Sequence, residues 1–111
     1  MSRRAIAFGG AIVCILPQVA AAQLLISEIM YDVSGTDTGR EWIEIYNEGA
    51  EVNLTEWKLL EGTTNHGIVA SGSEIVPSGT YAVIADNPTK FKTDWPSYSG
   101  LLFDSAFSLK N

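Results

Sequence analysis

The side chains best suited to chemistry are three carboxylates around one polar loop. Asp32, Asp37 and Glu41 lie in or beside a segment rich in Asp, Ser, Gly and Thr. Carboxylate oxygens are the ligands that Ca²⁺ prefers, although the spacing here does not fit an EF-hand loop. The sequence therefore suggests a calcium site at Asp32, Asp37 and Glu41, and it points to no other cofactor.

No set of catalytic residues can be assembled from the sequence. Glu41 and Glu44 resemble a glycosidase pair, but residues three apart on a strand point to opposite faces and cannot flank one bond. His66 has no Cys or second His near it, and the serines lack a Gly-x-Ser-x-Gly context. An aromatic binding platform at Trp95 and Tyr98 is the remaining alternative. The chain itself is predicted not to be an enzyme.

The strongest predicted strand is residues 39–47, with the sequence GREWIEIYN. Ile43 and Ile45 alternate with polar Glu44, so they share one face, which we place on the core. A second strong strand is predicted at residues 80–85. The residues expected to form the core are Trp42, Ile43, Ile45, Trp57, Leu59 and Val83.

Weaker strands are expected between and after these two. Residues 24–31 form a first strand, and residues 56–60 form another with Trp57 and Leu59 on one face. A short helix over residues 89–93 would follow the helix-starting pair Asn87-Pro88, and residues 106–109 would close the chain as a strand. Short strands separated by turns predict an all-β sandwich.

Residues 1–22 have the features of a secretory signal peptide. Arg3 and Arg4 precede an uncharged, mostly apolar stretch at residues 5–16, and three alanines at residues 20–22 favour cleavage before Gln23. The alternative is a membrane anchor, but the apolar stretch is shorter than the ~20 residues that span a bilayer. We therefore expect a secreted, periplasmic or cell-surface protein with no membrane span after cleavage.

The charge of the chain limits its partners. It has seven Lys and Arg against 13 Asp and Glu. Removing residues 1–22 takes away two arginines and no acidic residue, which leaves five basic minus 13 acidic side chains, a net charge of −8. Nucleic acids and anionic membranes recruit basic residues, so neither is expected as a partner.

Three stretches together resemble the lamin tail domain as it occurs in secreted bacterial proteins. They are residues 25–31 (LISEIMY), residues 41–47 (EWIEIYN) and residues 54–59 (LTEWKL), and the similarity continues through residues 75–85 and more weakly to residues 107–111. The resemblance implies an immunoglobulin-like β-sandwich with Trp57 at the core tryptophan position. Family members usually continue beyond the final Leu-x-Asn into further strands, so residues 23–111 are expected to be an incomplete domain lacking its last strand or strands, with an open edge near Phe107.

The resemblance also implies a function. We expect an exported, non-catalytic module that binds or tethers an extracellular ligand or cell-surface component, whose identity the sequence does not give. The alternative is an N-terminal accessory domain of a larger secreted hydrolase, of nuclease or phosphatase type, with its catalytic part beyond Asn111. A DNA-binding tail, a third hypothesis, runs against the negative charge.

Overall fold

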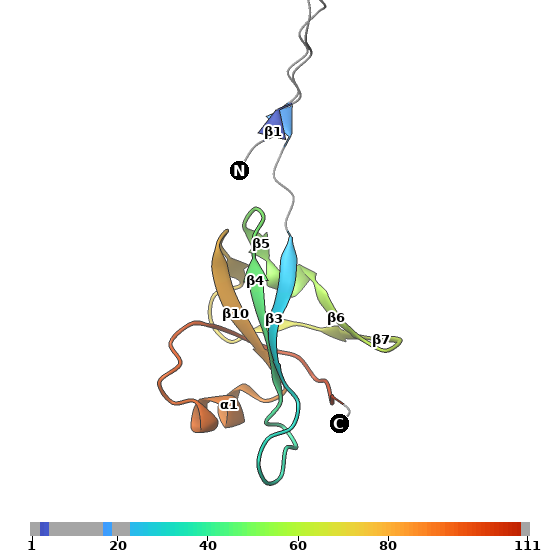
Figure 1. Cartoon of the computed structure of the whole chain (residues 1–111), viewed down its shortest axis with the longest axis vertical. Coiled ribbons are helices and arrows are strands. Elements are labelled where there is room, and N and C mark those ends of the chain that lie inside the picture. Colours follow the sequence, from blue (N-terminus) through green and yellow to red (C-terminus); the bar gives the residue numbers. More distant parts are fainter. Residues whose placement is uncertain (1–2, 5–16, 19–22, 110–111) are drawn as a thin grey trace, which may run out of the picture.

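The fold is dominated by strands, as a computed structural model of residues 3–4, 17–18 and 23–109 shows (Figure 1). The strands are β1 (Arg3–Arg4), β2 (Pro17–Gln18), β3 (Leu24–Met30), β4 (Trp42–Asn47), β5 (Val52–Asn53), β6 (Lys58–Glu61), β7 (Thr64–Gly67), β8 (Val69–Ala70), β9 (Ile75–Val76), β10 (Thr80–Ala85) and β11 (Leu101–Asp104). A 3₁₀ turn, η1 (Leu54–Glu56), and one helix, α1 (Pro88–Asp94), complete it. The predicted all-β class is confirmed.

The predicted signal peptide, residues 1–22, lies outside the described residues except at residues 3–4 and 17–18. These form β1 and β2, which pair antiparallel. Among the residues that the structure describes, no helix is long and apolar enough to cross a membrane.

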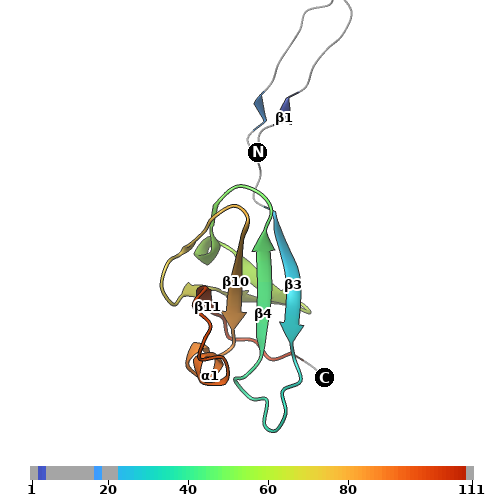
Figure 2. The same cartoon turned by 60° about the vertical axis from the view of Figure 1, so that its left-hand side comes forward.

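One sheet of five strands organises the molecule, in the order β3-β4-β10-β11-β8. Figure 2 shows β3, β4 and β10 side by side, with α1 following the end of β10. β4 runs antiparallel to both neighbours, whereas β10 and β11 are parallel and are connected through α1. The helix starts where the sequence predicts, because the side chain of Asn87 accepts a hydrogen bond from the N–H of Lys90 and Pro88 occupies the first turn.

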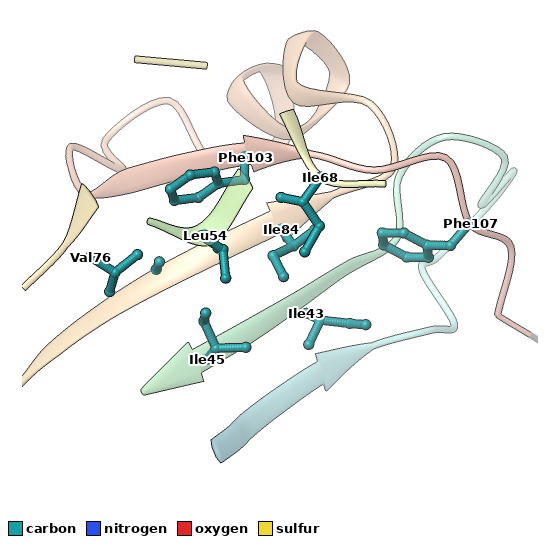
Figure 3. Close-up of a cluster of buried hydrophobic side chains, with 9 residues drawn as sticks. Ile43, Ile45, Leu54, Ile68, Val76, Ile84, Phe103 and Phe107 are labelled. Carbon is teal, nitrogen blue, oxygen red and sulfur yellow. The ribbon is translucent and has the colours of Figure 1, made fainter. Parts of the chain in front are cut away.

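Both faces of the central strands β4 and β10 are covered. On one face lies the main core, in which Ile43 and Ile45 contact side chains brought from distant segments (Figure 3). Its buried members are Ile43, Ile45, Leu54, Ile68, Val76, Ala82, Ile84, Phe103 and Phe107. On the other face a second cluster packs Trp42 and Val83 against Phe91 of α1. Four predicted core residues, Trp42, Ile43, Ile45 and Val83, are therefore buried, but they are divided between two clusters.

Trp57 is not a core residue, which corrects the sequence-based prediction. Its side chain is 37% exposed, and it follows η1 instead of lying in a strand. Asn53 caps this turn by accepting a hydrogen bond from the N–H of Thr55, and the N–H of Trp57 returns to the carbonyl of Leu54. The turn places Leu54 in the core and leaves Trp57, at its end, partly exposed. Leu59, on β6, is half-buried and packs against the main core.

The segment 106–109 is not a strand, contrary to the prediction. Phe107 from this segment is buried in the main core. Exposed apolar side chains lie nearby on β3, at the edge of the five-stranded sheet, where Leu25, Ile26 and Ile29 are all exposed and Ile29 lines the same cleft as Leu109.

Candidate functional site

The structure does not assemble the predicted calcium ligands. Asp32 is exposed in the loop after β3, Asp37 is half-buried further along that loop, and Glu41 is 4% exposed just before β4. Within the described residues, no three or more His, Cys, Asp or Glu side chains form a group that could hold a metal ion. The described structure therefore does not bring Asp32, Asp37 and Glu41 together as one set of metal ligands, and the calcium site stays a prediction.

Two of the three predicted carboxylates do meet, together with one that the sequence analysis did not name. Asp37, Glu41 and Asp86 line a cleft of about 500 Å³ whose wall also includes Ser108 and Leu109. A backbone hydrogen bond holds Asp86 next to Glu41, since the N–H of Asp86 donates to the carbonyl of Glu41 at 3.1 Å. Asp86 follows β10 directly and is far from Glu41 in sequence, so only the pairing of β10 with β4 brings the two together.

Gly39 sits at the corner of this cleft and cannot easily be replaced. Its φ of +73° favours glycine, and a Cβ there would lie 3.1 Å from the Cδ and Nζ atoms of Lys90. Lys90 in turn donates to the carbonyl of Thr38 at 3.0 Å, which ties the loop to α1. Arg40 makes a second tie with a pair of hydrogen bonds to the Asp94 carboxylate at 2.9 and 3.2 Å.

Carboxylates hold the segment 106–109 in place of a partner strand. Glu41 Oε1 accepts a hydrogen bond from the N–H of Leu109 at 3.1 Å, and Glu61 Oε1 accepts one from Ser108 at 3.4 Å. The Asp86 carboxylate accepts from the N–H of Phe107. Three successive backbone donors are thus satisfied by side chains and not by a neighbouring strand.

The electrostatics of the cleft follow from this burial. Desolvation raises the pKa of the Glu41 carboxyl, the hydrogen bond from Leu109 opposes the rise, and nearby negative charges, Asp37 first among them, add to it. Burial raises the pKa of Asp86 as well. The second oxygen of Glu41, Oε2, is buried without a hydrogen-bond partner among the described residues. Glu41 and Asp86 therefore act as anchors that are costly to keep charged.

The other candidate groups also have structural partners. Glu44 lies on β4 and accepts a hydrogen bond from Ser27 Oγ at 2.9 Å, on the sheet face opposite to that of Ile43. His66 Nε2 lies 3.0 Å from Glu61 Oε1. Trp95 packs edge-on against Trp42 but remains 44% exposed, and the ring of Tyr98 packs edge-on against Phe91.

A second cleft is the feature that sequence reasoning missed. It has a volume of about 710 Å³ and lies between β3, the turn from β6 to β7 and the segment 106–109. Ile29 and Tyr31 contribute apolar surface on one side, and Glu61 and Leu109 lie on the other. The spacing of Ile26 and Ile29, with two polar residues between them, departs from strict alternation and could have indicated the bulge that places both on one face of β3.

Comparison with protein families gives one finding. The family model of the Lamin Tail Domain matches residues 17–110, and this family is a non-enzymatic immunoglobulin-like domain. The comparison with curated proteins gives no match, and the comparison with solved structures gives none either.

Proposed function

The chain belongs to the lamin tail domain family, and we propose that it is exported and works as a non-catalytic module that binds or tethers a component outside the cell. The observation that carries this proposal is the extent of the family match. It covers residues 17–110 of a 111-residue chain, so nearly every described residue belongs to an immunoglobulin-like module and to no separate catalytic unit. Such a module acts through its surface.

The chemistry of the surface supports binding over catalysis. Glu41 and Asp86 of the smaller cleft accept hydrogen bonds from the backbone of the segment 106–109, and so does Glu61, the acidic residue that partners His66. A nucleophile, a base and an orienting group within reach of one another would be needed for hydrolysis. The negative charge of residues 23–111 argues for a partner that is neither nucleic acid nor an anionic membrane.

Export is the part of the proposal that the sequence alone supports, and it can be tested through the small residues before the cut. Signal peptidase requires small side chains at the first and third positions before the cleaved bond, here Ala22 and Ala20. Ala22→Tyr should therefore block processing of the full chain, whereas Ala21→Tyr, at the tolerant position between them, should not. N-terminal sequencing of the exported protein should begin at or next to Gln23.

Two results would contradict the proposal. An intact Met1 on exported protein, or equal processing of both tyrosine variants, would show that residues 1–22 are not a signal peptide. Turnover of a nuclease or phosphatase substrate by the purified chain, lost in a point variant, would show that it is an enzyme. A native gene that encodes a hydrolase after Asn111 would instead favour the accessory-domain hypothesis.

A further inference from the structure

The face of the five-stranded sheet opposite the main core, here called the outer face, is only partly covered. Trp42 of β4 and Val83 of β10 lie on this face and pack against Phe91 of α1. The helix is short, and Figure 2 shows it at one end of β10, β4 and β3. In a β-sandwich the second sheet packs on the core face, so further strands of such a sandwich do not cover the outer face. The side chains beyond α1 therefore form a surface of the module itself.

Beyond α1, the outer face carries three large side chains side by side, here called the outer row. Tyr46 pairs with Tyr81 of β10 on one side and with Leu25 of β3 on the other. The rings of Tyr46 and Tyr81 are in contact, with their centroids 4.7 Å apart and their planes inclined at 47°. Tyr81 is 53% exposed and Leu25 is 42% exposed. The outer row therefore presents aromatic and apolar surface to solvent.

The polar side chains next to the outer row are acidic. Glu44 lies two residues before Tyr46 on β4, so it is on the same face, about 7 Å along the strand. Glu28 of β3 pairs with Glu44, which places two carboxylates at facing positions. Like charges at paired positions destabilise a sheet, and Ser27 Oγ, which donates to Glu44 Oε1 at 2.9 Å, brings no positive charge. A cation bound here would offset this repulsion.

The strands that form this surface supply no cation of their own. β3, β4 and β10 contain no Lys or Arg. Within the part of the chain that the structure describes, one cation lies over an aromatic ring, and it is Lys92, whose Nζ is 6.0 Å from the centroid of the Tyr98 ring and donates to the Tyr98 carbonyl. The outer row has no such partner, although the faces of tyrosine rings attract cations. Its rings and the two carboxylates together favour a positively charged ligand.

The geometry of the outer row selects among cations. A primary ammonium is compact and strongly hydrated, so it gains little at an exposed ring. A quaternary ammonium carries methyl groups, which can remove apolar surface of Tyr81 and Leu25 from water while the charge stays near the ring faces. Because the two tyrosine rings are inclined at 47°, they suit a rounded group better than a flat one that stacks on a level platform.

We propose that the outer row binds a trimethylammonium group of an extracellular ligand, with the charge balanced by the neighbouring glutamates. The methyl groups contact Tyr81 and Leu25, and the positive charge lies near Glu44. This inference rests on the proposed function, since it names the class of ligand that the exported binding module takes.

Choline is the probe that tests this inference, and its binding to the full 111-residue chain can be followed by chemical-shift changes in NMR spectra. Two analogues separate the contributions. The neutral analogue with carbon in place of the ammonium nitrogen keeps the shape without the charge, and ethanolamine keeps the charge without the methyl groups. Each should bind about fivefold more weakly than choline or worse. This comparison uses the unaltered chain, so it does not depend on the folding of any variant.

Substitutions locate the binding to the outer row. Tyr81→Ala should weaken choline binding by about fivefold or more, whereas Tyr81→Phe keeps the ring and should bind within about twofold of the unaltered chain. Glu44→Gln should weaken binding by about threefold, because it removes a nearby negative charge. Tyr31→Ala is the matched control, since Tyr31 is 50% exposed but follows the end of β3 farthest from Leu25, and it should bind choline like the unaltered chain.

Three results would overturn the proposal. They are no binding of choline, equally tight binding of the neutral analogue or of ethanolamine, and unchanged choline binding by Tyr81→Ala. None of them bears on the removal of residues 1–22 or on turnover of a substrate. A failure of choline binding would therefore leave the exported, non-catalytic module standing, and a failure of export would leave the binding result standing.

Discussion

Two neighbouring strands, β4 and β3, carry isoleucines in paired positions, but these isoleucines differ in burial. Ile43 and Ile45 of β4 are buried, whereas their partners Ile29 and Ile26 on β3 are largely exposed. The difference does not come from the strands themselves but from what lies over them. Leu54, Val76 and Phe107 pack in the core that buries the two isoleucines of β4, and on β3 only Leu24 packs against this core. An apolar residue on a strand therefore indicates which face it occupies, and it does not indicate whether that face is closed.

Replacement of paired isoleucines by alanine tests this difference most directly. Ile45→Ala should lower the free energy of unfolding by about 2–5 kcal/mol, because it leaves a cavity in a packed core. Ile26→Ala, at the position paired with it, should cost about 1 kcal/mol or less, since most of that side chain is already in water. Urea denaturation of the two variants gives the comparison. Equal losses would show that β3 is as well covered as β4.

A second test concerns the hydrogen bonds by which Asn47 of β4 holds the backbone of Ala50 and Val76. Asn47, at the end of β4, is fully buried and donates from Nδ2 to the carbonyls of Ala50 and Val76 at 2.8 and 3.0 Å. Asn47→Ala should cost about 1–3 kcal/mol, because it leaves buried carbonyl groups without a donor. Thermal or urea unfolding gives this value.

The matched control for this tie is Asn65→Ala, at an exposed position on β7, which should change stability by about 0.5 kcal/mol or less. If both asparagine variants lose the same small amount of unfolding free energy, the hydrogen bonds of Asn47 do not hold residues 50 and 76 against β4. Packing of the apolar side chains would then account for their position.

The third and smallest effect is the pH dependence that the buried carboxylates impose. In the folded chain the pKa of Glu41 is raised, so the folded state holds its proton more tightly than the unfolded state does. The contribution of Glu41 to stability is therefore fully present below the ordinary carboxyl pKa and is lost as pH rises through the raised value. Glu41→Gln removes this dependence while its side-chain oxygen can still accept from Leu109, so the variant should melt at a higher temperature than the unaltered chain at neutral pH.

Melting curves measured from about pH 4 to about pH 7, across the range of carboxyl titration, would show this gain shrinking as pH falls. Glu28→Gln on the open edge of β3 is the control, because Glu28 is exposed, and it should leave the difference between acidic and neutral pH unchanged. A Glu41→Gln variant that melts lower at neutral pH would mean that the charge of Glu41 stabilises the anchor of the segment 106–109.

Much of the local structure was predictable because it depends on short patterns. The alternation of Ile43 and Ile45 gave β4, the run Thr80–Ala85 gave β10 with its observed bounds, and Asn87 with Pro88 marked the start of α1. The family resemblance, drawn from a few strand motifs, is also confirmed. These features follow from side-chain alternation and capping, which act between residues close in the chain.

The site and the limits of the core depended on contacts between residues far apart in the chain. Asp86 meets Glu41 through the pairing of β10 with β4, and carboxylates from three separate segments accept hydrogen bonds from the N–H groups of residues 107–109. Trp57 is partly exposed because a short turn places Leu54 in the core before it. The sequence by itself determined which segments extend and which faces are apolar, since those properties are local. Only the tertiary structure decided which of those faces is covered, because burial is a property of what packs against a residue and not of the residue itself.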